Sequence, residues 1–166
     1  TGDLADTATG PGWVERALAE FGRLDALVNN AAVVGPVAPL AAASPDDVER
    51  SLTVNLLAPV RAILHALPAL RASQGRVVHL SSMAAHRPVP GWGAYCTSKG
   101  GLSLFARTLA LEEPDVVSVS LSPGMTDTGM QAEIRREGVA GMPAAVHARF
   151  TAAHAAGELV CADRAG

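Results

Sequence analysis

The sequence predicts an α/β fold in which strands alternate with helices around a parallel sheet. Three short apolar runs with strand character, 24–28, 76–80 and 116–121, are separated by longer segments with helical spacing of apolar residues. Such alternation favours a parallel sheet with right-handed crossovers. The runs end in Asn29-Asn30, Ser81-Ser82 and Pro123-Gly124. Because parallel sheets bind ligands beyond the carboxyl ends of their strands, these polar ends predict a site along one edge.

Length, charge and cysteine usage exclude several function classes. The 166 residues, 49% hydrophobic and 17% charged, suit a single globular domain spanning 1–166. The formal net charge of −3 argues against nucleic-acid binding. No unbroken apolar run approaches the ~18 residues of a membrane span, so no membrane partner is expected. Cys96 and Cys161 form neither a metal nor a redox motif, so we expect free thiols, no metal and a cytoplasmic location.

The first predicted helix spans 13–21. Pro11 precedes it, Gly22 ends it, and its apolar stripe consists of Trp13, Ala17, Leu18 and Phe21. The run 24–28 that follows is predicted to be a buried strand, because it is short, apolar and closed by two asparagines.

The second predicted helix begins after Ser44. Ser44 suits the N-cap, Pro45 the first helical position, and Asp46 and Asp47 the first turn. The helix is expected to continue to about residue 72. The prolines at positions 59 and 68 lie inside it and are expected to bend or split it.

The remaining elements follow from the same signals. We predict a strand over 76–80, a helix over 94–111 that stops before Pro114, and a strand over 116–121. Segment 125–157 has helical spacing of apolar residues and is expected to form flap helices over the substrate site.

One pair of residues carries the predicted chemistry. Lys99 is the single lysine of the chain, and it lies four residues after the single tyrosine, Tyr95, so the two share a helix face. A phenol has a pKa of about 10, and a nearby ammonium lowers it toward a value useful for proton transfer. Ser82, at a strand end, could bond the same substrate oxygen. The alternative is a half-buried tyrosine beside an exposed lysine on an ordinary helix.

Two other sets of residues near these positions leave alternatives open. Trp92 and Met125 flank the polar strand ends, and either pocket lining or core packing suits them. His79 and His86 lie near Ser82 and would suit a hydrolase, but the Gly-x-Ser-x-Gly elbow is absent, so a hydrolase is discounted.

With these residues in view, the sequence resembles the short-chain dehydrogenase/reductase family. Four family motifs occur in order: Asn29-Asn30-Ala31-Ala32; Asn55 within Val54-Asn55-Leu56; Ser82 thirteen residues before Tyr95 in Tyr95-Cys96-Thr97-Ser98-Lys99; and Pro123-Gly124-Met125-Thr126-Asp127-Thr128. Segment 34–37 and the tail 151–160 are most similar to the sepiapterin reductase and benzil reductase branch.

The resemblance implies four catalytic residues. Tyr95 would protonate a carbonyl oxygen during reduction, or deprotonate an alcohol in reverse. Lys99 would lower the pKa of Tyr95 and bond the nicotinamide ribose. Ser82 would orient the substrate carbonyl, and Asn55 would hold a water in a proton relay from Lys99 to solvent.

The resemblance also implies NADP or NAD as the cofactor, with NADP slightly favoured. Tyr95 and Lys99 would contact it at the nicotinamide end. The other implied cofactor-binding residues are Asp3 and Leu4 beside the adenine, Asn30 and Ala31 through the main chain, and Pro123, Gly124 and Thr128, of which Thr128 would bond the carboxamide or pyrophosphate.

The sequence departs from the family at its beginning and end. The glycine-rich phosphate turn, Thr-Gly-x-x-x-Gly-x-Gly, is absent, and Gly2 and Gly10 do not reproduce it. By the resemblance, the chain is an incomplete domain, truncated at both ends. It would be a partial Rossmann-type doubly wound sheet without its N-terminal βαβ half and last strand. The strand 24–28 would then present an unpaired apolar edge.

Three functions remain in view. The first is an NAD(P)H-dependent carbonyl reductase or alcohol dehydrogenase acting on a small carbonyl or alcohol. The second is an inactive fragment of such an enzyme that acts only as a partner or oligomerisation chain. An epimerase of the extended branch shares the Tyr and Lys, but Asn29-Asn30-Ala31 is not its usual pattern. The resemblance also implies a homo-oligomer, a dimer or a tetramer.

Overall fold

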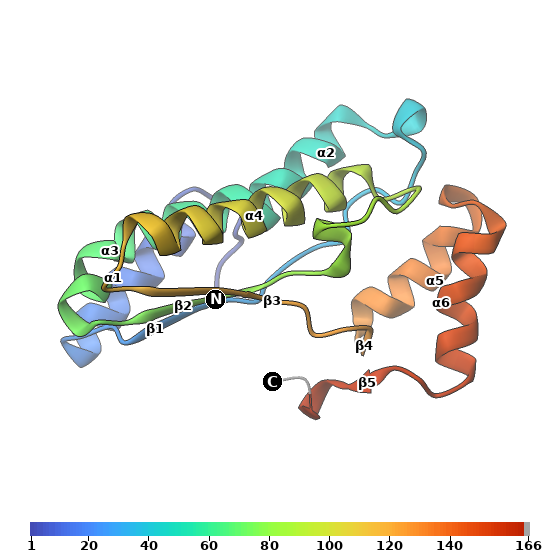
Figure 1. The fold of residues 1–166 in the computed structure, drawn as a ribbon. Helices are drawn as coiled ribbons and strands as arrows, with labels where there is room; N and C mark the ends of the chain where they lie inside the picture. The colour runs from blue at the N-terminus through green and yellow to red at the C-terminus, as the bar shows by residue number, and fades with distance from the viewer. Residues whose placement is uncertain (165–166) are drawn as a thin grey trace.

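The computed structural model describes residues 1–164 and confirms a parallel sheet of strands alternating with helices (Figure 1). Strands β1 (Ala26–Asn29), β2 (Arg76–Leu80) and β3 (Val117–Leu121) pair in the order β1-β2-β3, all parallel. β2 occupies the predicted residues, and β3 begins one residue later than predicted. The three carboxyl ends therefore meet at one edge of the sheet, as the sequence predicts.

Three helices lie over the same face of this sheet: α1 (Thr9–Phe21), α3 (Ala58–Ser73) and α4 (Gly93–Glu112) (Figure 1). A buried apolar cluster fills the space between helices and sheet; its fully buried members include Ile63, Leu70 and Val77. Strand register decides which side chains enter it, since Leu27, Val77 and Ser118 are aligned and alternate residues face away.

The opposite face of the sheet is apolar and exposed. Val28 is 58% exposed and Leu121 52%, and the side chains of Val117 and Val119 are also accessible. The prediction that the first strand is buried is therefore wrong. β1 lies at the sheet edge, and among the described residues no helix covers this second face. The expectation of an unpaired apolar edge is confirmed.

Helix α1 begins four residues before the predicted start, so Pro11 lies within its first turn, where a missing N–H costs nothing. Gly22 ends the helix with φ 72°, as predicted. The predicted apolar stripe is partly wrong, because Trp13 is 45% and Phe21 74% exposed. The buried residues are instead Gly10 and Val14, because α3 crosses α1 there: a Cβ on Gly10 would lie 3.1 Å from that of Ala62.

The second predicted helix is continuous from Pro45 to Ser73 but changes its winding once. α2 (Pro45–Leu52) leads into a π-helical turn, η2 (Thr53–Leu57), and then into α3. The prolines do not split it: Pro59 lies in the first turn of α3, where proline is tolerated, and Pro68 remains inside the helix. Ser44 precedes α2 but makes no side-chain cap hydrogen bond.

By length and composition alone, this helical stretch is long and apolar enough to cross a membrane, with a mean hydropathy of 1.3 in its most apolar window. Arg61 and His65 interrupt its apolar run, so the unbroken-run criterion predicts no membrane span here. Core helices of globular proteins pass the same test, and this one supplies Ile63 and Leu70 to the apolar cluster.

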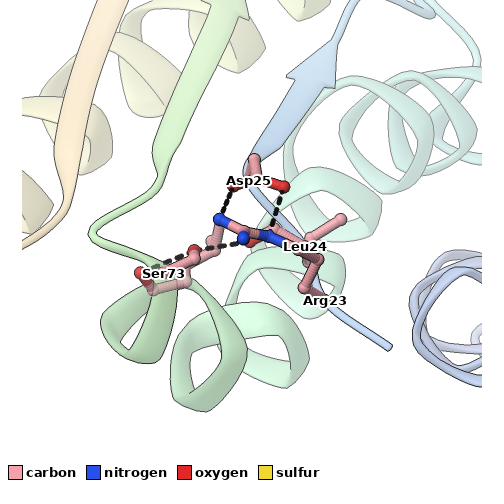
Figure 2. A network of polar contacts seen from close by, with 5 residues as sticks. Arg23, Leu24, Asp25 and Ser73 are labelled. Carbon is pink, nitrogen blue, oxygen red and sulfur yellow. Dashed lines mark hydrogen bonds and ion pairs between the residues drawn. The ribbon is translucent and has the colours of Figure 1, made fainter. Parts of the chain in front are cut away.

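A polar junction fixes where β1 begins (Figure 2). The hydroxyl of Ser73, at the end of α3, donates to the carbonyl of Leu24 at 2.6 Å. Beside it, Nε of Arg23 donates to the carboxylate of Asp25 at 2.9 Å, and the amide of Arg76 donates to the carbonyl of Asp25 at 2.9 Å. The junction joins the end of α3 to the first strand pair and so sets its register.

Helices α5 (Gly129–Gly141) and α6 (Ala144–Ala155) form a hairpin beside the sheet (Figure 1), which confirms helices within 125–157. Two short strands, β4 (Thr126–Asp127) and β5 (Val160–Cys161), pair parallel at its base and were not predicted. The remaining elements are the 3₁₀ turns η1 (Leu40–Ala42), η3 (Met83–Ala85) and η4 (Ala162–Arg164).

We expect Ile63→Ala to lower the free energy of unfolding by about 2–5 kcal/mol, because it opens a cavity in a fully buried cluster. The matched control is Val139→Ala at an exposed position of α5, with an expected change below about 0.5 kcal/mol. Urea denaturation followed by circular dichroism measures both. Equal losses in the two variants would contradict the assignment of this helix face to the core.

Candidate active site

Tyr95 and Lys99 lie one turn apart near the N-terminus of α4, with both side chains buried. Nζ of Lys99 lies over the Tyr95 ring, 5.7 Å from its centroid. The shared helix face is therefore as predicted. The alternative of an exposed lysine on an ordinary helix is wrong, since Lys99 is only 3% exposed.

Lys99 reaches from α4 to the end of β2. Its Nζ donates to the carbonyl of Leu80 at 2.7 Å, which uses one of the three N–H donors of an ammonium. Burial lowers the pKa of Lys99 to about 8, because a charged group loses hydration inside the protein. Near neutral pH this side chain is a cation with two donors to spare.

Burial raises the pKa of the Tyr95 phenol above its ordinary value, and the neighbouring Ser82 hydroxyl acts in the opposite direction. The expected lowering of this pKa by Lys99 is therefore wrong for the protein without cofactor, in which the pKa is raised. Loss of hydration on burial is the largest influence on this pKa. Ser82 stands at the start of η3, where its Oγ also accepts from the amide of Ala84 at 3.1 Å.

Asn55, in the π-helical turn, is buried and fully engaged through its side chain. Its Oδ1 accepts from the amide of Val33 at 2.9 Å, and its Nδ2 donates to the carbonyl of Val33 at 2.8 Å and to Oγ of Ser98 at 3.2 Å. The Ser98 hydroxyl in turn donates to the carbonyl of Tyr95 at 2.9 Å. Asn55 thus ties the loop after β1 to the helix that carries Tyr95. Its side chain has no amide hydrogen left for a relay water.

A cleft of about 180 Å³ opens where β1 ends, between α1 and the start of α3. It brings together Leu4, Asn30 and Ala31, three of the predicted cofactor residues. Asp3 does not line it. The Asp3 carboxylate instead accepts from the amide of Ala5 at 2.9 Å and lies 3.6 Å from Arg50.

The other predicted cofactor residues, Pro123, Gly124 and Thr128, follow β3 and do not line this cleft. Gly124 has φ 80°, and a Cβ added there would meet no atom within 4 Å. Thr128 directly precedes α5 and is exposed, with no side-chain cap bond to that helix. Gly124 and Thr128 are exposed at the carboxyl end of the sheet, and Pro123 is half-buried.

Trp92 connects Tyr95 to the helical hairpin. Its buried ring contacts the Tyr95 ring edge-on, with centroids 5.3 Å apart, and lies 5.1 Å from the ring of Phe150 on α6. The surrounding apolar cluster also holds Ile134 and Met142 from the hairpin. Of the two uses that the sequence leaves open for Trp92, the structure shows core packing, in contact with Tyr95.

Sequence reasoning missed the environment of His79, which is buried in β2 close enough to Lys99 to feel its charge. The available signal was its place in a strand two residues after Val77, on the same buried face. Within residues 1–164 there is no group of three or more His, Cys, Asp or Glu side chains that could hold a metal ion.

Comparison with known proteins agrees with these motifs. A family model described as short chain dehydrogenase matches residues 1–138. Benzil reductase ((S)-benzoin forming) of Bacillus subtilis is 43% identical over 117 residues, which are 66% of this chain and 47% of that protein. Sepiapterin reductase of Bos taurus is 36% identical over 118 residues, 68% of this chain and 44% of that protein. The chain spans about half the length of the curated relatives that it matches.

Solved structures agree as well. A short chain dehydrogenase/reductase from Saccharomyces cerevisiae superposes with a TM-score of 0.93 at 33% identity, over 97% of this chain and 64% of that one. An alcohol dehydrogenase from Thermococcus sibiricus, solved in complex with 5-hydroxy-NADP, gives 0.72 at 28% identity over 76% of this chain and 53% of that one.

Because Lys99 is the single lysine, its titration can be followed alone by NMR of selectively labelled protein. We expect a midpoint near pH 8, as burial requires. In urea-unfolded chain the same signal should return to the ordinary value of about 10.4. A folded-state midpoint above pH 10 would contradict the buried placement of this side chain.

Proposed function

The chain belongs to the short-chain dehydrogenase family, and from that premise we propose that it carries the catalytic residues of an NAD(P)-dependent carbonyl reductase or alcohol dehydrogenase. The observation that carries the proposal is the buried pair of Tyr95 and Lys99 beside Ser82, at the carboxyl end of a parallel sheet. A titratable pair of this kind, with shifted pKa values, is typical of proton-transfer sites.

In the direction of reduction, a bound dinucleotide supplies hydride to the carbonyl carbon. Tyr95 gives its phenolic proton to the carbonyl oxygen, and Ser82 donates a hydrogen bond to the same oxygen. Hydride and proton together convert a ketone to an alcohol; the reverse reaction returns both. The raised pKa of Tyr95 keeps the phenol protonated near neutral pH, which suits the role of acid.

Lys99 has two further roles in this proposal. Its ammonium, over the Tyr95 ring, stabilises the phenolate that remains after proton transfer. One of its two spare N–H donors fits a ribose hydroxyl of the nicotinamide half, which supplies a partner that a buried cation needs. Asn55 acts by fixing the helix under Tyr95, and its predicted relay water stays a prediction.

The remaining residues fit a dinucleotide in part. Leu4, Asn30 and Ala31 share the cleft at the end of β1 and would hold the cofactor there. Pro123, Gly124 and Thr128 follow β3 and would hold it from there, whereas Asp3 would have to exchange its contact with Arg50. The described residues include no glycine-rich turn for the pyrophosphate. We propose NADP or NAD as the cofactor, with NADP slightly favoured; one structural neighbour was solved with 5-hydroxy-NADP and another with NAD+.

The substrate is proposed to be a ketone or diketone. The Trp92, Met142 and Phe150 side chains build an apolar wall next to Tyr95, and apolar walls with a few polar groups are typical of small-molecule sites. Helices α5 and α6 within 125–157 would form the flap over it. Benzil, which the related Bacillus subtilis enzyme is named for, is the first compound to test.

A homo-oligomer, dimer or tetramer, is part of the proposal. The outward faces of α3 and its preceding turn and of α4 expose leucines seven residues apart, Leu57 and Leu64 on one and Leu104 and Leu111 on the other. Such a spacing puts each pair on one side of its helix, and exposed apolar surface of this kind marks interfaces. We propose a cytoplasmic location, in keeping with the free thiols of Cys96 and Cys161.

We expect Tyr95→Phe to lower kcat for benzil reduction at least about 100-fold, because it removes the proton donor. The measurement is the rate of NADPH consumption with benzil as substrate, made on the natural polypeptide that contains these residues. The control is Phe21→Tyr, an exchange between the same two residue types at an exposed site, which should leave turnover unchanged. Turnover retained in Tyr95→Phe, with a native melting curve, would overturn the proposed mechanism.

We expect the isolated 166-residue chain to bind NADPH weakly, because its described residues lack the glycine-rich turn that grips the pyrophosphate. Calorimetric titration of NADPH, then NADH, into folded protein should show no binding at micromolar ligand. Micromolar binding would mean that the residues present build the phosphate site in another way.

A further inference from the structure

His79 is a buried histidine that the proposed mechanism does not use. It lies in the middle strand β2, is 0% exposed, and neither of its ring nitrogens has a hydrogen-bond partner among the described residues. Two unpaired nitrogens at such depth are unusual, since buried polar atoms are nearly always bonded to protein or to ordered water.

His79 faces α4, and its two neighbours on the adjacent strands, on the same face of the sheet, are polar. Strand register places Asn29 of β1 and Ser120 of β3 on either side of it. Nδ2 of Asn29 is likewise buried and unpaired. Ser120 is satisfied, because its hydroxyl pairs with that of Ser103 on α4 at 3.1 Å. Three buried nitrogens thus lie close together without partners: Nδ2 of Asn29, which is a donor, and the two ring nitrogens of His79, of which a neutral ring has one donor and one acceptor.

Lys99 enters the same place from α4. The carbonyl that its ammonium bonds, at 2.7 Å, belongs to Leu80, the residue directly after His79. That leaves two N–H donors of the ammonium close to the unused imidazole. Buried polar groups that face one another without direct contact are the usual setting for an internal water with three or so bonds.

We propose that His79 is a positioning residue for Lys99: its unpaired ring nitrogen accepts, through one internal water, a hydrogen bond from the ammonium and holds it against β2 over Tyr95. Asn29 donates to the same water. The inference rests on the proposed function, because it explains how the lysine that serves Tyr95 is held.

The charges around His79 agree with this role. Burial, and then the charge of Lys99, lower the pKa of His79 to about 4. The ring is therefore neutral at neutral pH and keeps an acceptor nitrogen for the ammonium. Of the charged groups in residues 1–164, Lys99 is the one that acts on this pKa; the flanking Asn29 and Ser120 do not titrate.

The test titrates Lys99, the single lysine, by NMR in folded chain without cofactor or substrate. His79→Leu removes the acceptor at similar volume, so the midpoint of Lys99 should fall by about one pKa unit, because the ammonium loses a bond that favours its charged form. His79→Asn, which keeps an acceptor, should restore at least half of the fall. The control Ser120→Ala changes the other neighbour in the same row and should leave the midpoint in place.

A second measurement keeps the test decisive if His79→Leu fails to fold. In Lys99→Met, the pKa of His79 should rise from about 4, because a neighbouring positive charge is gone. An unchanged Lys99 midpoint in folded His79→Leu, or an unchanged His79 midpoint in Lys99→Met, would overturn the proposal. Because neither experiment measures turnover, its failure is distinguishable from failure of the Tyr95→Phe test.

Discussion

The placement of one buried ammonium constrains the catalytic half of this fold. A lysine charge inside a protein is tolerated only with hydrogen-bond partners, and Lys99 finds its partner in the carbonyl of Leu80 at the end of β2. That bond sets how α4 lies along the sheet. Tyr95, one turn earlier on the helix, and Ser82, just beyond the strand, are then brought to the same end of the sheet, where the Ser82 hydroxyl acts on the Tyr95 phenol.

Burial acts on the two members of the pair in opposite directions. It raises the pKa of Tyr95 and lowers that of Lys99 to about 8, so both neutral forms are favoured. Between pH 8 and the ordinary value of 10.5, unfolded chain binds more protons at this lysine than folded chain. Stability from this group therefore rises with pH across that window and is lowest below it. Keeping the Lys99 ammonium charged inside the fold lowers stability, which indicates that the charge has a functional role.

The sequence predicted what local signals control. β2, α4 and β3 are bounded by turn residues and Pro114 and match to within one residue. The features that the sequence did not predict depend on residues distant in the chain. Val28 is exposed because the second face of the sheet is uncovered among the described residues. The π-helical turn at Asn55 accompanies its hydrogen bonds to Val33 and Ser98. The direction of the Tyr95 pKa shift depends on the burial of the phenol, which four-residue spacing does not specify.

The helical hairpin of α5 and α6, the proposed flap, and Tyr95, the proposed proton donor, share one apolar cluster. Ile134 and Met142 of the hairpin help to bury Tyr95 through Trp92, and the hairpin docks by close backbone contact: a Cβ on Gly141 would overlap the carbonyl of Val37. Opening the flap would admit water to the phenol and let its pKa fall toward 10, since burial is what raises it. Closure over a carbonyl substrate would thus exclude water from the phenol before the proton is transferred.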